Sequence, residues 1–579
     1  MPEAITNNIA LWSSALLTRS TAGRGSNGKL EAYGIKKLRE LILELAVRGK
    51  LLPQDPNDEP ASELLKHIQA EKAKLIAEGK IRKGKPLPSI IEDEKLFKLP
   101  HGWEWVRLGT LGEWGAGATP ARGNSKYYGG DIPWFKSGEL TADYISQSEE
   151  TVTELALKEC SLRANSVGDV LIAMYGATIG KTAILSVPAT TNQAVCACTP
   201  FNGIANRYLL LLLKALKPNF IGQGAGGAQP NISREKIIAT ITALPPLDEQ
   251  HRIVAKVDEL MALCDQLEQQ QTHSIAAHQT LVASLLGTLT RVESQQEFSE
   301  AWARIASHFD TLFTTEASID QLKQTILQLA VMGKLVPQDS DDEPANALLK
   351  RIQTEKAKLI AEGKIKKGKP LEPITEDEKL FELPKLWEWV RFGDLATQIT
   401  DGAHHTPEYI SDGVPFLSVK NLSSGYLDFT DTRFISPAAH VDLTKRCNPE
   451  LDDILLTKIG TTGIAVVIDD PRPFSIFVSV ALIKLPKVLI DRDYLSLVIN
   501  SPFVRQQSED GTEGVGNKKL VLRKISTFDI PLAPLAEQHR IVAKVDELMA
   551  LCDTLKARLA DAQAIQLHLA DAIVEQAVC

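Results

Sequence analysis

Hydrophobic positions in two stretches of the chain recur at alternating intervals of four and three residues. The first stretch follows Pro245 and Pro246 and places apolar side chains at Ile253, Val257, Leu260, Cys264 and Leu267. The second repeats the spacing with Ile541, Val545, Leu548, Cys552, Leu555 and Leu559. Such a heptad seam predicts a helix that buries one stripe against other helices. A helix of about 40 residues would be about 60 Å long at a rise of 1.5 Å per residue.

Each seam must be covered by another apolar surface. The nearest candidates are residues 35–47 and 319–331, which carry their own stripes of Leu and Ile. A coiled coil and a plain helix-bundle core explain these stripes equally well. Both interpretations predict a helical scaffold.

The scaffold sequence occurs twice. Residues 44–109 recur at 328–393 with an offset of 284, and 49 of the 66 positions are identical. Residues 246–268 recur at 534–556, with 20 of 23 positions identical. Two similar surfaces can bind two copies of one partner about a pseudo-twofold axis. The repeat therefore predicts a symmetric scaffold.

The segments between the repeats, roughly 110–243 and 394–531, differ far more in sequence. They still share a skeleton, because Gly176 and Gly460 fall at the same offset in two related apolar runs. Both are rich in short β-branched and aromatic runs that are cut by Gly, Pro, Asn and Asp, which is typical of strand-rich domains. We expect a common fold with different surface chemistry, and an α/β (α+β) protein overall.

Composition adds two constraints. The chain is 44% hydrophobic and 24% charged, as in soluble proteins. No apolar stretch approaches the ~18 residues of a membrane span, and no signal peptide is evident. Seven cysteines without a CxxC pair indicate reduced thiols, so we expect a cytoplasmic protein without a membrane association. The net charge of −9 argues against nucleic-acid binding, because DNA-binding domains are usually basic.

The order of the repeats resembles a known family. A variable domain, a PLxEQHRIVAKVDEL helix, a second variable domain and a second such helix are similar to type I restriction-modification specificity (S) subunits, the HsdS family. LAVRGKL at 45–51 and WEWVRLG at 103–109 are further hallmarks. The resemblance extends from about Tyr33 to the C-terminus. Residues 1–34 and 283–318 have no partner in the repeat.

The resemblance implies a function and a domain plan. The two segments between the repeats would be target-recognition domains, at 101–245 and 385–533. Each would read one half of a bipartite, asymmetric double-stranded DNA target. Long antiparallel coiled-coil-like helices would separate them. The remaining bounds are an N-terminal extension 1–34, scaffold repeats 35–100 and 319–384, spacer helices 246–286 and 534–579, and a linker 287–318.

Partners and cofactors also follow from the resemblance. The scaffold would hold two modification (M) subunits, which use S-adenosylmethionine to methylate adenine N6, and two restriction (R) subunits, which use ATP and Mg. This chain would have no catalytic residue, metal or cofactor of its own. The alternative is an assembly scaffold that pairs two copies of a partner without reading DNA, as the acidic charge would favour.

Two motifs suggest other chemistry and are better explained as loops. YGATIGKT at 175–182 leaves three residues between its glycines where a phosphate-binding loop needs four, and a strand-like run follows it. His404 and His405 are adjacent, so on an extended segment they point to opposite faces and no carboxylate or Cys cluster completes a metal site.

Base reading requires Arg, Lys, Asn or Gln in the loops of the middle domains. In the first domain the candidates are Lys136, Ser137, Lys181, Thr182, Asn192, Gln193, Gln229 and Asn231. In the second they are His404, His405, Lys420, Asn421, Lys458, Thr461, Asn517, Lys518 and Lys519. Each alone is more simply an exposed polar residue, but together they mark the loops that we expect to face DNA.

Basic runs also recur within the scaffold. They contain Lys80, Arg82 and Lys83 in one copy and Lys364, Lys366 and Lys367 in the other. Such a run is usually a solvated helix end. The duplication favours either symmetric phosphate clamps or a partner interface, and we favour the partner because both runs lie in the scaffold.

Overall fold

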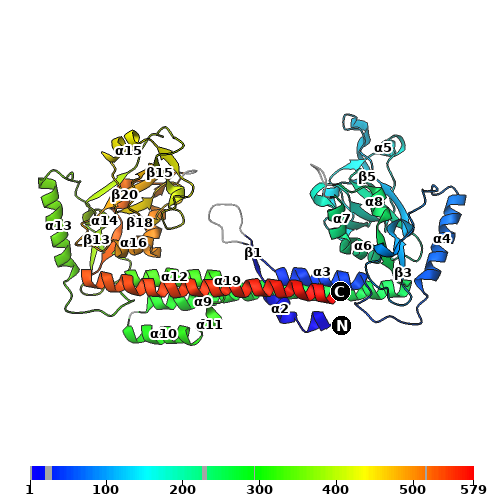
Figure 1. Ribbon diagram of the computed structural model, residues 1–579, viewed down its shortest axis with the longest axis horizontal. Coiled ribbons are helices and arrows are strands. Elements are labelled where there is room, and N and C mark those ends of the chain that lie inside the picture. The colour runs from blue at the N-terminus through cyan, green and yellow to red at the C-terminus, as the bar shows by residue number, and fades with distance from the viewer. Residues whose placement is uncertain (1–2, 20–28, 225–230, 293, 515–517, 579) are drawn as a thin grey trace. The chain divides into compact units, whose positions relative to one another are not determined.

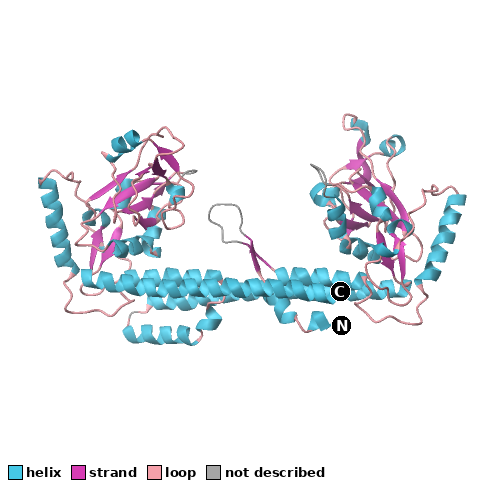
Figure 2. Ribbon diagram, in the orientation of Figure 1, coloured by secondary structure: helices cyan, strands magenta, loops and turns pink. Residues whose placement is uncertain are grey.

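The heptad seams form two of the longest helices that the structure describes, α9 (Leu247–Arg291) and α19 (Leu535–Val578). The computed structural model describes residues 3–19, 29–224, 231–292, 294–514 and 518–578. The chain divides into a first unit, residues 1–274 with 562–579, and a second unit, residues 275–561. Each unit contains a strand-rich domain and a set of scaffold helices (Figure 1, Figure 2).

The first strand-rich domain, domain 1, contains two sheets. The larger sheet has the order β4 (Gly112–Ala116), β11 (Val195–Pro200), β8 (Val170–Ala173), β9 (Thr182–Leu185) and β6 (Tyr144–Ile145). The smaller has the order β10 (Thr190–Thr191), β5 (Tyr128–Phe135) and β7 (Thr151–Val152). Helices α5 (Glu154–Glu159), α6 (Asn206–Ala215), α7 (Lys217–Gly224) and α8 (Arg234–Ala239) complete it.

Domain 2, in the second unit, repeats this plan. Its larger sheet has the order β14 (Gln398–Asp401), β20 (Val480–Lys484), β17 (Ile454–Thr457) and β18 (Ala465–Val467). Its smaller sheet has the order β16 (Arg433–Ile435), β15 (Val414–Leu417) and β19 (Ser475–Ile476), and a hairpin joins β21 (Thr512–Glu513) to β22 (Lys519–Leu520). Its helices are α14 (Phe392–Leu395), α15 (Pro437–Thr444), α16 (Arg492–Asn500), α17 (Pro502–Asp510) and α18 (Leu522–Ser526).

Two short ladders close the domains at their roots. Strand β3 (Glu104–Arg107) pairs antiparallel with β12 (Ile241–Leu244), and β13 (Glu388–Arg391) pairs in the same way with β23 (Asp529–Leu532). The WEWVR motif therefore joins the beginning of each domain to its end.

One apolar helix seats each domain on the scaffold. In α6 the residues Tyr208 to Leu213 are all buried, because the helix packs between β9 and the scaffold helix α3 (Tyr33–Val47). In domain 2 the helix α16 lies between β18 and the scaffold helix α12 (Glu316–Val331). Buried tyrosines add a hydrogen bond at each place, from Tyr208 to the Ala243 carbonyl and from Tyr494 to the Pro531 carbonyl.

The scaffold of the first unit confirms the predicted seam. Ile253, Val257, Leu260 and Cys264 are at most 1% exposed and share one core with the buried face of α3. Arg39 of α3 forms an ion pair with Asp265 at 2.6 Å. Residues 562–578 of α19 complete this bundle, where Tyr33 donates a hydrogen bond to Asp571 at 2.8 Å.

The scaffold of the second unit has the same arrangement. Ile541, Val545 and Cys552 are buried with the apolar face of α12, and Val282, Leu286 and Leu289 of α9 belong to the same core. The contacts run antiparallel between α12 and α19, since Asp320 faces Lys556 and Lys323 faces Asp553.

Each long helix begins after the strand-rich domain of one repeat and ends against the scaffold segment of the other repeat. Lys50 donates to the carbonyl of Val578 at 3.0 Å, close to the last residue of α19. Lys334, at the same repeat position as Lys50, donates to the carbonyls of Thr290 at 3.1 Å and Val292 at 2.7 Å, at the end of α9. An ammonium group at this place donates hydrogen bonds to carbonyls that lack a helical partner. Its positive charge also interacts favourably with the negative end of the helix dipole.

Two segments without a partner in the repeat contain helices. Residues 287–318, expected to be a linker, contain the end of α9, then α10 (Gln295–Ser307) and α11 (Phe309–Leu312). The extension 1–34 contains α1 (Glu3–Thr6), α2 (Ile9–Ser14) and the hairpin of β1 (Leu17–Arg19) and β2 (Lys29–Glu31). Trp12 and Ile5 are buried in the core of the first unit, so the extension is part of the fold.

The other scaffold helices are α4 (Ala61–Ala77) and α13 (Ala345–Ala361). Glu71 of α4 accepts hydrogen bonds from the backbone and the side-chain amide of Asn202, both at 2.9 Å, so α4 contacts domain 1. Among the described helices, none combines the length and the hydropathy that a membrane span requires.

Candidate nucleic-acid interface

The predicted base-reading residues of domain 1 that the structure describes gather at one edge of its sheets. Antiparallel pairing places Ala116 opposite Cys196 and Ala173 opposite Val195, so β4 and β8 end where β11 begins. Strand β9 also begins here, since Ile172 pairs with Thr182. We call the loops at this place the loop edge of domain 1: residues 117–119, 136–137, 174–181 and 191–194.

Domain 2 has an equivalent loop edge: residues 402–405, 418–421, 458–463, 477–479 and 518–519. Its strands meet in the same way, since Asp401 pairs with Ala481 and Thr457 with Val480. The Leu520 amide donates to the Lys458 carbonyl at 2.8 Å, which brings the hairpin beside the edge. The two unlike domains thus present loops from equivalent strand ends.

A glycine turn lies at each loop edge. Residues 174–180 connect β8 to β9, and the Gly180 amide closes this turn by donating to the Ala173 carbonyl at 3.0 Å. Residues 458–463 do the same in domain 2, where the Gly463 amide donates to the Thr457 carbonyl at 2.8 Å. The φ angles of Gly180 and Gly463 are +76° and +81°, which glycine adopts without strain. A strand follows Gly180, so the turn lacks the helix of a phosphate-binding loop.

Several predicted residues of domain 1 are available at its edge. Gln193 and Asn231 are exposed, and Lys181 is half-buried and its side chain makes no hydrogen bond or ion pair among the described residues. Lys136 and Ser137 follow β5, but Lys136 already contacts Glu149 at 2.7 Å and Glu150 at 3.1 Å. Asn192 shapes its own loop by accepting from the Ala194 amide at 3.1 Å. Gln229 lies outside the described residues.

In domain 2 the available residues are His405, Thr461, Lys518 and Lys519, which are all exposed. Lys420 is exposed and forms an ion pair with Asp431 at 2.9 Å. His404 contacts Asp401 at 2.9 Å. Asn517 lies outside the described residues.

Three predicted readers are buried, which corrects the expectation for them. Thr182 is 7% exposed within β9. Asn421 is 2% exposed, and its amide nitrogen donates to the carbonyls of Asp428 and Asp431. Lys458 is 2% exposed. The side-chain nitrogens of Asn421 and Lys458 are bonded inside the domain, and Thr182 is enclosed within its strand, so these residues shape the edge and do not present groups to a ligand.

Lys458 belongs to a buried charge cluster around Asp401. Its ammonium lies 2.8 Å from Asp401 Oδ2, while His404 and Arg446 each lie 2.9 Å from Oδ1. Burial alone would raise the pKa of Asp401, but the hydrogen bonds from Lys458 and His404 outweigh it and hold that pKa below its usual range. At the matching positions domain 1 has Ala116 and Met174, since Gly117 and Gly402 make equivalent backbone hydrogen bonds to Val195 and Val480. The cluster therefore distinguishes the two edges.

Two stacked arginines were not predicted. The Arg122 guanidinium lies 5.0 Å from the ring centroids of both Tyr128 and Trp134. Arg433 lies 5.6 Å from the ring centroid of Tyr409, and its side chain makes no hydrogen bond or ion pair among the described residues. No local motif signals these pairs, because the loop before β5 must fold back over that strand in one and a bridge between Ile410 and Phe434 forms the other.

The basic runs of the scaffold follow helices α4 and α13 in the chain. All six of their predicted residues are exposed. Lys80 and Lys364 form matching ion pairs with Glu78 and Glu362, each at 2.8 Å. Arg82, Lys83, Lys366 and Lys367 have no partner among the described residues.

The chemistry of the loop edges is that of ligand recognition. They offer ammonium, amide, imidazole and hydroxyl groups, which can donate to and accept from base edges and phosphates. Within the described ranges no three His, Cys, Asp or Glu side chains are placed to hold a metal ion.

The duplicated frame with two different loop edges defines a class of two-domain recognition protein, and comparisons with known proteins give its family. The model of the type I restriction modification DNA specificity domain matches residues 100–277 and 384–562. The chain is 42% identical to the EcoAI specificity subunit of Escherichia coli and 40% identical to the EcoEI specificity subunit. Both alignments cover 100% of this chain and 99% of the relative.

The chain therefore belongs to the specificity-subunit family of type I restriction-modification systems. Among solved structures, it resembles the HsdS subunit from Thermoanaerobacter tengcongensis with a TM-score of 0.41 and 18% identity, over 84% of this chain and 98% of that one.

Proposed function

We propose that the two loop edges read the two halves of a bipartite, asymmetric DNA target. The observation that carries this proposal is that the two domains share one framework of strands and turns but present different side chains at their loop edges. The glycine turns of both domains are closed by corresponding backbone hydrogen bonds, yet Asp401 and Lys458 occupy positions that are Ala116 and Met174 in domain 1. Because base readout depends on the donors and acceptors offered in the groove, two such edges select different sequences.

The same argument weighs against a scaffold that does not touch DNA. Such a scaffold needs the repeated helices but has no use for two unlike loop edges. The net charge of −9 is compatible with DNA binding when the acidic residues are paired locally. At the edges this is so for Glu149 and Glu150 beside Lys136, and for Asp401 beside Lys458.

We propose further that each repeated scaffold segment binds one modification subunit. Arg82, Lys83 and their counterparts Lys366 and Lys367 are exposed cations without partners. Leu96 and Leu380 occupy equivalent positions and are 72% and 73% exposed. A large apolar side chain that is exposed in both copies is typical of a protein interface. In this account S-adenosylmethionine, ATP and Mg bind to the modification and restriction subunits, and this chain has no catalytic group.

The proposed docking is tested by charge reversal in one copy at a time. Arg82→Glu with Lys83→Glu should remove one modification subunit from the purified complex, and Lys366→Glu with Lys367→Glu should remove the other. Native mass spectrometry counts the subunits. Unchanged stoichiometry in both variants would contradict the assignment of the docking surface.

The reading function is tested by mapping methylated adenine in the genome of a host that expresses this chain with its modification subunit. The expected motif is asymmetric and interrupted, with N6-methyladenine in both halves. A palindromic or absent motif would instead support the assembly scaffold.

A further inference from the structure

Each glycine turn has an unpaired cation beneath it. A Cβ atom at Gly180 would lie 2.6 Å from Cγ of Lys217, the first residue of α7. A Cβ atom at Gly463 would lie 2.8 Å from the Ser508 Cβ and 3.6 Å from the Arg505 Cδ, both in α17. Neither Lys217 nor Arg505 makes a side-chain hydrogen bond or ion pair among the described residues.

The two cations lie in the same place beneath their turns, but they come from different positions in the sequence of the two domains. The buried tyrosines Tyr208 and Tyr494 match with an offset of 286, so Arg505 corresponds to Asn219 and Lys217 corresponds to Phe503. The helices themselves correspond, since α7 directly follows α6 and α17 directly follows α16. A cation is thus present under both turns although the residue that supplies it differs in type and position. A retained ancestral residue does not explain this recurrence, whereas a shared ligand does.

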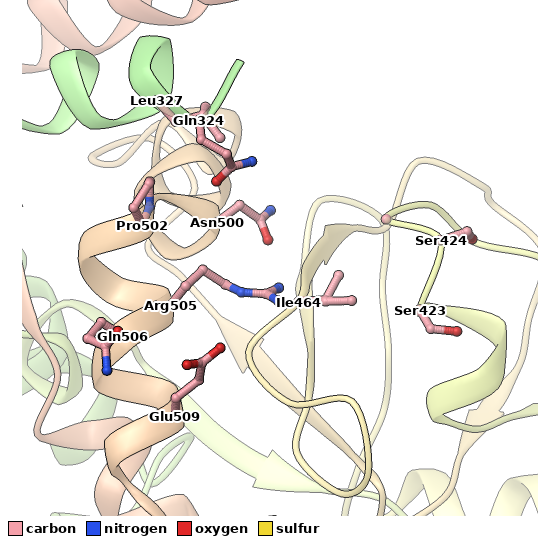
Figure 3. Close-up of a pocket in the computed structure, with 11 residues that line it drawn as sticks. Gln324, Leu327, Ser423, Ser424, Ile464, Asn500, Pro502, Arg505, Gln506 and Glu509 are labelled. Carbon is pink, nitrogen blue, oxygen red and sulfur yellow. The ribbon is translucent and has the colours of Figure 1, made fainter. Parts of the chain in front are cut away.

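In domain 2 the cation opens onto a hollow of about 600 Å³ between α17, α12 and the segment that follows Lys420. Figure 3 shows the Arg505 side chain reaching from α17 across this hollow toward Ile464 and Ser424. Ser423 and Ser424 present hydroxyl groups, and Gln324 of α12 presents an amide. Beside Arg505, the Ser508 hydroxyl is fully buried and has no hydrogen-bond partner among the described residues.

Glu509 is the one carboxylate among the residues that line the hollow. It lies one turn after Arg505 and forms no ion pair with it. Its charge opposes an anionic ligand, so a ligand held by Arg505 must place its negative group on the side of the glycine turn. That side is the loop edge.

We propose that Lys217 and Arg505 are phosphate clamps, each of which holds one phosphodiester group of the DNA backbone next to the half-site that its domain reads. A guanidinium or ammonium group under a tight turn can contact a phosphate while the turn itself approaches the groove. The contact positions the domain on the duplex and carries no base information. This inference rests on the proposed reading function.

The clamps are tested by the salt dependence of DNA binding by the full chain in complex with its modification subunit. Each phosphate contact contributes about 0.9 to the slope of log K against log salt. Lys217→Gln and Arg505→Gln should each reduce that slope by about one unit and weaken binding roughly tenfold at 0.1 M salt. Glu509→Gln should tighten binding, since it removes the opposing charge.

Controls separate this inference from the function on which it rests. Lys217→Arg and Arg505→Lys should retain the slope, and Lys350→Ala, which removes an exposed lysine of α13, should leave it unchanged. The methylated motif should be the same in all variants. If the wild-type complex binds its motif but the Gln variants keep the wild-type slope, the clamps are refuted and the reading function stands. If the wild-type complex binds no specific DNA, the reading function itself fails. Loss of modification subunit from the Gln variants, with DNA affinity unchanged, would identify a protein ligand and overturn the proposal.

Discussion

The indole nitrogen of Trp103 donates a hydrogen bond to the carboxylate of Glu249 at 2.9 Å, and both residues are buried. The second repeat reproduces the contact, with Trp387 and Glu537 also at 2.9 Å. The bond joins the WEWVR motif to the beginning of the long helix, so it fixes each domain to its spacer. Glu249 and Glu537 are the Glu of PLxEQ, which explains why both motifs recur together in the repeat.

This contact gives the stability of the protein a defined pH dependence. Burial raises the pKa of Glu249 and Glu537, although hydrogen bonds from Trp and Gln side chains partly oppose it. The folded state therefore binds protons more tightly than the unfolded state. The contribution of these two glutamates to stability should be fully present below the ordinary glutamate pKa of about 4.3 and should be lost as pH rises through the raised folded value.

Substitutions at Glu249 separate the hydrogen bond from the charge. Glu249→Gln keeps an acceptor for Trp103 and should remove this part of the pH dependence without loss of stability at neutral pH. Glu249→Ala leaves the buried indole nitrogen without a partner and should cost about 1–3 kcal/mol. Denaturant unfolding at several pH values measures both. An equal loss for Gln and Ala would contradict this role for the hydrogen bond.

The buried pair of Lys458 and Asp401 should be needed only by domain 2. Lys458→Met copies the residue of domain 1 but leaves Asp401 without its best-buried partner, which should destabilise domain 2 by about 3–5 kcal/mol. Adding Asp401→Asn should recover a large part of this loss. Hydrogen exchange monitored by domain gives the measurement, and domain 1 serves as the internal control. An equally unstable double variant would show that the charges are not coupled.

Lys50 and Lys334, which cap the C-terminal ends of α19 and α9, should stabilise those two helix ends to the same extent. Lys50→Ala and Lys334→Ala each remove a cation from the carbonyl end of α19 or α9, which is worth about 0.3–1 kcal/mol. Hydrogen exchange in the last turn of each helix should increase, whereas Lys350→Ala should have no effect there. Unchanged protection of residues 574–578 in Lys50→Ala would refute the capping role.

Thiol reactivity should follow burial. Burial raises the pKa of Cys196 and Cys447 to about 12 and that of Cys264 to about 11. Cys160 is only half-buried. An alkylating reagent at pH 8 should therefore modify Cys160 before these three, because the thiolate is the reactive form. Mass spectrometry of peptides tests the order, and early labelling of Cys264 would show that the seam opens.

The scaffold could be predicted from the sequence because it is periodic and duplicated. The heptad positions from Ile253 to Cys264 are buried as expected, and they pack on the segments that were named as candidates. The match of Gly176 with Gly460 likewise anticipated equivalent turns. These signals are local or repeated, so one chain contains enough information to find them.

The character of individual edge residues could not be predicted in the same way. Lys458 resembles an exposed reader in the sequence, but its partner Asp401 lies 57 positions earlier and is brought close only by strand pairing. Lys217 and Arg505 were not recognised, because a cation becomes informative only when it is seen to be unpaired beneath a turn. Residues 287–318 lack a repeat and seemed a linker, yet the capping Ser294 and the apolar face of α10 form a helix there.

The most direct test of the central claim is the methylation motif of a chain that carries domain 1 twice. Residues 394–531 would be replaced by residues 110–243, which the shared root ladders and glycine turns should accommodate. Because both positions would then hold the same loop edge, the account predicts a palindromic motif built from one half of the wild-type target. If adenine methylation still occurred at the original asymmetric motif, domain 2 would not be a reader and the account would be wrong.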